Sequence, residues 1–131
     1  FYKKLKRDPT WLEVLGNGKQ RKSYLYVQDC IDSILLAIEK GQKKVNLFNL
    51  GVNGYCTVND SIGWICEALG VDPKLNYSGG ERGWIGDNPF IYLDTQKINQ
   101  MGWKPKHGIQ EAILKTIKFL RLNEWVFEKR Q

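Results

Sequence analysis

The amino-acid sequence predicts an α/β protein, and three observations support this class. Apolar residues make up 42% of the 131 residues, which is enough for a hydrophobic core. Short runs typical of strands alternate with runs whose apolar residues recur at helical spacing. No stretch with the composition of a linker interrupts the chain, so we expect residues 1–131 to form one unit without an internal boundary.

The first elements predict a helix followed by a hairpin. Residues 1–7 form a helical run that ends before Pro9, because a proline disfavours helical backbone in the residue before it. Residues 11–15 and 23–27 are extended runs. Residues 16–18, Gly-Asn-Gly, tolerate the positive φ angles of a tight turn, so we expect the two runs to pair as a hairpin.

The middle of the chain predicts a helix, a strand and a second helix. Residues 29–40 carry apolar side chains at helical spacing, and Asp29 can cap the N terminus of this helix. Residues 45–50, VNLFNL, are expected to form a strand. Thr57 and Asp60 have the spacing of a capping box, which predicts the start of the next helix.

The last third predicts short strands and two helices around a glycine-rich loop. Residues 75–77 and 90–93 are extended runs on either side of the loop formed by residues 78–89. Residues 94–102 predict a helix capped by its first residue, an aspartate. Residues 109–125 predict the final helix, with apolar side chains on one face.

Composition limits the compartment in which the protein works. Its three cysteines, Cys30, Cys56 and Cys66, lack the paired spacing of zinc or redox sites, which suits a reducing compartment. No apolar run is long enough to span a bilayer, so we expect a cytoplasmic protein without a membrane partner. The chain begins with Phe1 rather than methionine, as expected for a piece of a longer protein.

The net charge of +6 is compatible with two kinds of acidic partner, a phosphorylated small molecule or a polyanion such as nucleic acid. Most lysines and arginines lie in small groups on helical runs beside apolar residues, which is typical of solvated surfaces. Trp64, Trp103 and Trp125 lie in or beside helices, where core packing is expected rather than base stacking. We expect no nucleic-acid partner, and a stand-alone basic binding module remains the alternative hypothesis.

Three partial motifs of enzymes have simpler explanations. Residues 51–54, GVNG, lack the third glycine of a dinucleotide loop and are interpreted as a plain turn. Tyr2 and Lys6 have the spacing of a proton-transfer pair but stand among other lysines at the start of the chain. His107, the only histidine, is expected to be a surface turn residue. We therefore expect no catalytic, cofactor-binding or metal-binding residue in this chain.

The loop at residues 78–89, SGGERGWIGDNP, carries unusual chemical groups for a turn. Arg82 can bind phosphate oxygens with its forked guanidinium, and Asp87 can accept hydrogen bonds from ribose or sugar hydroxyls. The alternative is a surface loop with an internal ion pair between these two residues, anchored by Trp84. A basic cluster at residues 19–22 can face a phosphate across a cleft, or form a solvated edge.

Several motifs in order resemble one enzyme family. They are GNGKQRKSYLYVQD, VNLFNLG, TVNDSI, RGWIGD and LDTQKINQMGWKP. Over residues 1–120 the chain resembles the carboxyl-terminal half of extended short-chain dehydrogenase/reductases that act on nucleotide sugars. This family includes UDP-glucose 4-epimerase-like enzymes and nucleotide-sugar 4,6-dehydratases. The resemblance implies the substrate-binding portion and last strand-helix elements of a Rossmann-type NAD(P)-binding epimerase fold, without its amino-terminal dinucleotide-binding half.

The resemblance also implies a role for four residues. Lys22 or Arg21, together with Arg82, would hold the nucleotide diphosphate, and Asp87 would contact the ribose. Position 22 is lysine where the family usually has arginine, so either of the two adjacent basic residues can be the phosphate ligand.

The resemblance further implies that catalysis depends on parts outside this chain. The family's glycine-rich loop for NAD and its Tyr-x-x-x-Lys pair lie in the amino-terminal half, so the chain is not expected to be active alone. The expected partner is a nucleotide-sugar, and the parent is expected to be a homodimer. Because residues 29–40 and 45–50 would pack on the absent cofactor-binding sheet, we expect the isolated chain to associate with itself.

Overall fold

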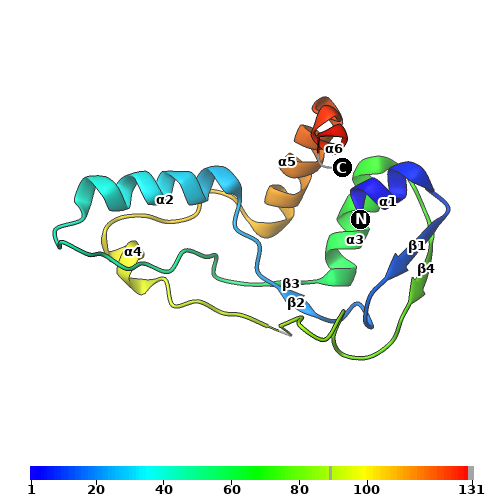
Figure 1. Ribbon diagram of the computed structural model, residues 1–131, viewed down its shortest axis with the longest axis horizontal. Coiled ribbons are helices and arrows are strands. Elements are labelled where there is room, and N and C mark those ends of the chain that lie inside the picture. Colours follow the sequence, from blue (N-terminus) through cyan, green and yellow to red (C-terminus); the bar gives the residue numbers. More distant parts are fainter. Residues whose placement is uncertain (89, 130–131) are drawn as a thin grey trace.

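The computed structural model describes residues 1–88 and 90–129. Figure 1 shows an elongated molecule with a compact part at one end and a long helix over extended segments at the other. We call the first part the body and the second the wing. The helices and strands in chain order are α1 (Tyr2–Arg7), β1 (Trp11–Val14), β2 (Arg21–Lys22), α2 (Val27–Lys40), β3 (Cys56–Thr57), α3 (Val58–Leu69), β4 (Lys74–Tyr77), α4 (Gln96–Gln100), α5 (Ile109–Leu122) and α6 (Trp125–Glu128).

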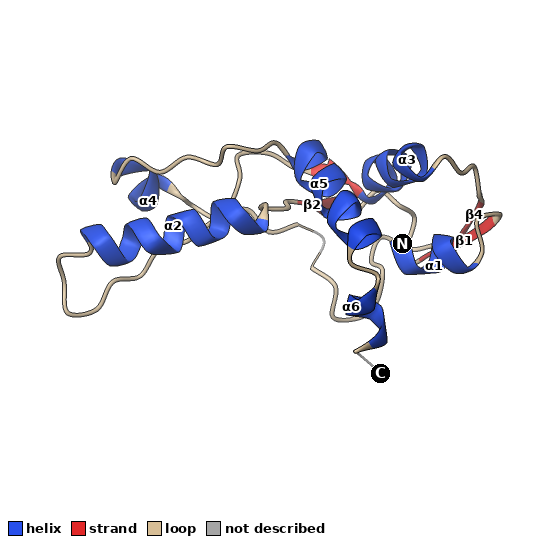
Figure 2. Cartoon of the chain, turned by 90° about the horizontal axis from the view of Figure 1, so that it is seen from above, coloured by secondary structure: helices blue, strands red, loops and turns tan. Residues whose placement is uncertain are grey.

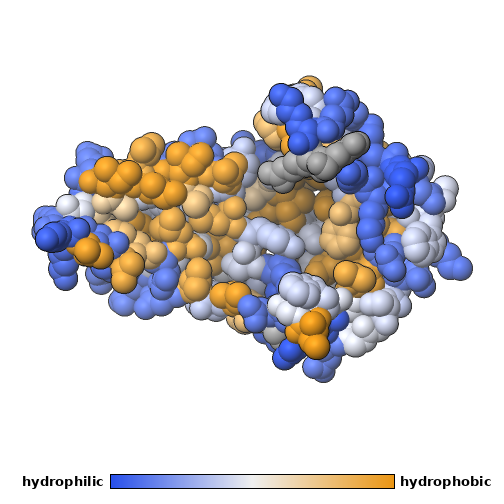
Figure 3. All heavy atoms as spheres, viewed as in Figure 1, coloured by the Kyte–Doolittle hydropathy of each residue, from blue (hydrophilic) through white to orange (hydrophobic). Residues whose placement is uncertain are grey.

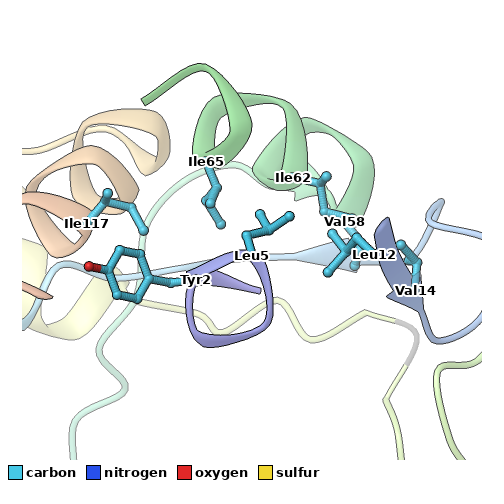
Figure 4. Close-up of a cluster of buried hydrophobic side chains, with 8 residues drawn as sticks. All are labelled: Tyr2, Leu5, Leu12, Val14, Val58, Ile62, Ile65 and Ile117. Atoms are coloured by element: carbon cyan, nitrogen blue, oxygen red, sulfur yellow. The ribbon is translucent and has the colours of Figure 1, made fainter. Parts of the chain in front are cut away.

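The body contains the hydrophobic core. Its strands β1 and β4 pair in parallel, with Leu12 opposite Leu75, although some sixty residues of chain separate them. Helix α1 packs against β1, and helices α3 and α5 pack against each other (Figure 1). The buried core side chains converge from α1, β1, α3 and α5, as Figure 4 shows: Tyr2, Leu5, Leu12, Val14, Val58, Ile62, Ile65 and Ile117. These contacts make the body the part that stabilises the fold.

Helix α3 begins at the capping box that the sequence predicted, and it ends at Leu69. Thr57 accepts a hydrogen bond from the backbone nitrogen of Asp60, and the Asp60 carboxylate accepts one from the backbone nitrogen of Thr57. Gly70 follows the helix with a left-handed φ of 68°, which glycine adopts without steric penalty. The capping box is therefore confirmed.

The expected hairpin of residues 11–15 and 23–27 is wrong. Strand β1 pairs with β4 instead, and residues 23–26 are coil that leads into α2. The chain crosses from the body through β2, which pairs antiparallel with β3 in a short ribbon. Gly16 and Gly18 do have positive φ angles of 80° and 75°, but they turn the chain towards α3 rather than back along β1.

The expected strands at residues 45–50 and 90–93 are also wrong, since both segments are coil (Figure 2). A strand requires a hydrogen-bonded neighbour, and the described part of the chain offers none at these positions.

The last two helical predictions are confirmed with shifted ends. Asp94 accepts a hydrogen bond from the backbone nitrogen of Gln96 at the start of α4, and the final predicted helix divides into α5 and α6.

The wing is attached to the body by a buried carboxylate. Asp29 is not the N-cap of α2, because the helix begins earlier, at Val27. Its side chain is 1% exposed and accepts hydrogen bonds from the backbone nitrogens of Lys106 and His107 and from His107 Nδ1, at 3.0–3.1 Å. The His107 ring also packs on Tyr26, with 4.7 Å between centroids. His107 is therefore a docking residue, and its prediction as a surface turn residue is wrong.

One face of α2 carries large exposed apolar side chains. They are Val27, Ile31, Ile34, Leu35 and Ile38, and Val45 and Leu47 of the adjacent segment are exposed as well. Figure 3 shows this apolar surface gathered over α2 and the coil below it. We call these seven residues the α2 surface. In the described part of the chain, no helix is long and apolar enough to cross a membrane.

Candidate nucleotide-binding cleft

A cleft of about 430 Å³ lies where the ribbon of β2 and β3 meets the glycine-rich loop. One wall comes from β2 and the residues after it, and another from residues 50–52. The third comes from the end of the glycine-rich loop and from the segment after it. The charged residues in its lining are Arg21, Lys22 and Asp87. The fold thus brings together three of the four predicted site residues, from segments that are far apart in the sequence.

Lys22 and Asp87 form an ion pair at the cleft. The ammonium of Lys22 lies 2.5 Å from Asp87 Oδ1 and also donates to the carbonyl oxygen of Asn88 at 3.2 Å. The two side chains are 25% and 15% exposed, so water screens this pair less than it screens a surface pair. The second carboxylate oxygen, Asp87 Oδ2, accepts a hydrogen bond from the backbone nitrogen of Gly83 at 3.2 Å.

These contacts keep Asp87 ionised. The hydrogen bond from Lys22 is the main reason why the pKa of Asp87 lies below its ordinary value of 3.8, and the hydrogen bond from Gly83 and the charges of Lys22 and Arg82 act in the same direction. Partial burial opposes them. A charged carboxylate accepts hydrogen bonds strongly, which suits a group that binds hydroxyls.

Arg21 lies on aromatic rings. Its guanidinium carbon is 5.1 Å from the ring centroid of Tyr55 and 5.6 Å from that of Phe90. The two rings meet edge to face, with centroids 5.4 Å apart. Neither aromatic residue was predicted to belong to the site. The position of Tyr55 just before the predicted capping box was a signal that it lies near the site. Nothing in the sequence indicates that Phe90 reaches the same arginine.

Arg82 is the predicted site residue that does not line the cleft. It is exposed, and its backbone carbonyl lies against Gly16 in the body. The predicted alternative, an ion pair of Arg82 with Asp87, is wrong because the carboxylate pairs with Lys22. Trp84 is 64% exposed, so its expected role as a packing anchor of the loop is also wrong.

The helix start after the GVNG turn does not have the free N–H groups of a pyrophosphate site. This helix is α3, and its first three backbone N–H groups already donate to the carbonyl oxygens of Gln20 and Gly18 and to the hydroxyl of Thr57. The Asp60 carboxylate would repel a pyrophosphate there. Tyr2 and Lys6 both contact Glu124 and do not line the cleft. Within residues 1–88 and 90–129, no group of three or more potential ligands could hold a metal ion.

Comparisons with known proteins agree with this architecture. The model of the NAD dependent epimerase/dehydratase family matches residues 2–51. A trifunctional UDP-glucose 4,6-dehydratase/epimerase/reductase of Arabidopsis thaliana is 29% identical over 119 residues, which are 87% of this chain and 17% of that protein. The dTDP-D-glucose 4,6-dehydratase of Mus musculus is 28% identical over 115 residues, 82% of this chain and 31% of that enzyme.

Solved structures extend the similarity to nearly the whole chain. A UDP-galactose 4-epimerase matches 95% of this chain with a TM-score of 0.79 and 32% identity, and the match covers 40% of that enzyme. UDP-glucose 4-epimerase from Thermotoga maritima, solved with UDP-glucose, matches 94% of this chain with a TM-score of 0.79 and 27% identity, over 38% of its own length. The chain therefore spans less than half of each of these relatives.

Fold and sequence together define the class as a mixed α/β chain that matches part of a Rossmann-type epimerase fold. Within that class, the chain is similar to NAD-dependent epimerases and dehydratases, which agrees with the resemblance of its motifs.

Proposed function

We propose that this chain is the nucleotide-sugar-binding part of an NAD-dependent epimerase or dehydratase, and that the cleft at β2 holds the nucleotide diphosphate. The observation that carries the proposal is the convergence of Lys22, Arg21 and Asp87 on one cleft. A cation for phosphate and a charged acceptor for hydroxyls are the two groups that such a ligand requires. Relatives solved with UDP-glucose support the choice of ligand class.

The geometry favours Lys22 over Arg21 as the phosphate ligand. The guanidinium of Arg21 lies over the rings of Tyr55 and Phe90, where its charge interacts with the ring faces. The ammonium of Lys22 lies at the end of a flexible side chain and can reorient towards a phosphate. We assign Asp87 to the ribose hydroxyls, and Arg82 to a supporting role through its charge near Asp87.

The redox chemistry belongs to the remainder of the parent enzyme in this proposal. NAD and the catalytic tyrosine and lysine would come from the part of the family fold that this chain does not contain. A coding sequence upstream of Phe1 should therefore encode a strand followed by a G-x-x-G-x-x-G loop and a Tyr-x-x-x-Lys pair. An upstream sequence without either motif would contradict the proposal.

Calorimetric titration of the chain with UDP and with dTDP tests the binding site. Replacing Lys22 by methionine removes a charge-assisted contact and should weaken binding of the preferred nucleotide by about tenfold or more. The matched control is Lys19→Met, since Lys19 is an exposed lysine of the same basic cluster outside the cleft. Arg82→Ala should weaken binding more than Lys19→Met does and less than Lys22→Met does. Equal losses for Lys22→Met and Lys19→Met would contradict the assignment.

The same titrations distinguish the alternative, a basic module for nucleic acid or another polyanion. Such a module would bind an oligonucleotide with an affinity that falls steeply with salt, and free UDP would not compete. We expect the reverse, namely competition by UDP and weak binding of the oligonucleotide.

A further inference from the structure

In the cleft, the opposite charges of Lys22 and Asp87 neutralise each other, although the two residues are 65 positions apart in the sequence. Lys22 comes from β2, and Asp87 comes from the glycine-rich loop. Both line the cleft, and the ion pair connects one of its walls to another. The same ammonium also holds the carbonyl of Asn88, so a single side chain fastens the end of the loop to the ribbon.

The loop segment at residues 83–87, just before Asn88, is closed by its own hydrogen bonds. The backbone nitrogen of Asp87 donates to the carbonyl of Trp84 at 3.0 Å, and the Asp87 carboxylate accepts from the backbone of Gly83. Before this unit stand Gly79 and Gly80, with φ angles of 81° and 80° and open space where a side chain would lie. A turn that is closed by its own hydrogen bonds and preceded by Gly80 can move as one piece when its attachment is released.

We infer that the Lys22–Asp87 ion pair is a latch that a ligand opens by replacing both partners. This inference rests on the proposed function, because it concerns the same cleft. The ammonium of Lys22 leaves Asp87 and binds phosphate oxygens of the ligand. The carboxylate of Asp87 then accepts hydrogen bonds from the ligand's hydroxyl groups. The loop at residues 83–88 is released from β2 and closes on the ligand instead.

The latch requires a ligand with two kinds of group. Inorganic pyrophosphate can take Lys22 but leaves Asp87, a poorly exposed carboxylate, without its cation. A nucleoside diphosphate brings an anion and a pair of ribose hydroxyls in one molecule, so it satisfies both partners. The pair therefore favours nucleoside diphosphates over free phosphate compounds.

Affinities for pyrophosphate and for UDP test the latch in three proteins: the unaltered chain, Asp87→Asn and Glu81→Gln. Asp87→Asn frees Lys22, so pyrophosphate should bind about tenfold more tightly, in line with the loss of one competing charge-assisted bond. The preference for UDP over pyrophosphate should shrink in the same variant. Glu81→Gln removes an equal charge from an exposed position of the same loop and should leave both affinities nearly unchanged. Equal effects of the two substitutions would overturn the latch, since they would reflect overall charge alone.

Hydrogen exchange of the free chain gives a readout that needs no ligand. Lys22→Met and Asp87→Asn should both speed exchange at residues 83–88 severalfold, whereas Glu81→Gln should not. Unchanged exchange in both latch variants would overturn the inference. If exchange speeds up as expected but neither pyrophosphate nor UDP binds any of the proteins, the proposed function fails, and the pair is a structural contact rather than a latch.

Discussion

Single polar side chains join segments of this chain that are distant in sequence. Lys22 reaches Asp87 across 65 residues, and Asp29 reaches His107 across 78. The two contacts differ in exposure, because the Asp29 side chain is almost fully buried, whereas the Lys22–Asp87 pair faces a cleft. A buried carboxylate with three donors stabilises the fold, and a pair at a cleft is available to a ligand.

Replacing Asp29 tests its role in attaching the wing. Asp29→Ala leaves two backbone N–H groups and His107 Nδ1 without their acceptor, so the free energy of unfolding should fall by about 3 kcal/mol. Asp29→Asn keeps one acceptor oxygen and should cost less. Chemical denaturation measures both, with Asp72→Ala as the exposed control. A loss no larger than that of the control would contradict the attachment.

Acid should weaken the contribution of Asp87 to the stability of the fold. Its pKa in the folded chain is lowered, chiefly by the hydrogen bond from Lys22. The resulting stabilisation is complete above the ordinary pKa of an aspartate and is lost as the pH falls through the lowered value. The difference in free energy of unfolding between the unaltered chain and Asp87→Asn should therefore shrink on acidification from neutral pH. A difference that stays constant would mean that the carboxylate has no special partner in the fold.

At the scale of elements, the sequence was informative where local signals decide the structure. The capping box and Gly70 delimit α3 through contacts within a few residues. The predicted strands at residues 23–27, 45–50 and 90–93 failed because a strand depends on a partner that local composition does not reveal. The site follows the same division. Asp87 was predicted as a candidate from its chemistry and Lys22 from the family resemblance, but their mutual ion pair depends on how the distant loop folds.

The capping box of α3 gives a prediction at this scale. Thr57→Ala removes the acceptor for the backbone nitrogen of Asp60 and should lower the free energy of unfolding by about 1 kcal/mol. Thr57→Ser keeps the hydroxyl and should restore most of the stability. Thermal or chemical denaturation measures the difference, and Glu67→Ala, at an exposed position of the same helix, is the control. Similar stabilities of the alanine and serine variants would show that the cap is dispensable.

For the whole molecule, the contrast between body and wing is the dominant feature. The body buries its apolar side chains between two strands and three helices. The wing leaves the α2 surface exposed, with Leu35 at 58% and Ile38 at 74%. Exposed apolar patches of this kind usually mark a surface that another polypeptide covers. The net charge of +6 opposes association between copies, so hydrophobic and electrostatic effects act in opposite directions here.

We expect the isolated chain to associate with itself through the α2 surface. Covering a large aliphatic side chain contributes on the order of 1–3 kcal/mol, and the seven side chains together should outweigh the repulsion between basic copies. Because salt screens that repulsion, association should strengthen as ionic strength rises. Sedimentation over a wide range of concentrations measures it. The double variant Leu35→Glu, Ile38→Glu should shift the chain to monomer, whereas Leu122→Glu, at a similarly exposed position on α5, should not. A chain that remains monomeric at high concentration and high salt would show that the α2 surface is stable in water on its own.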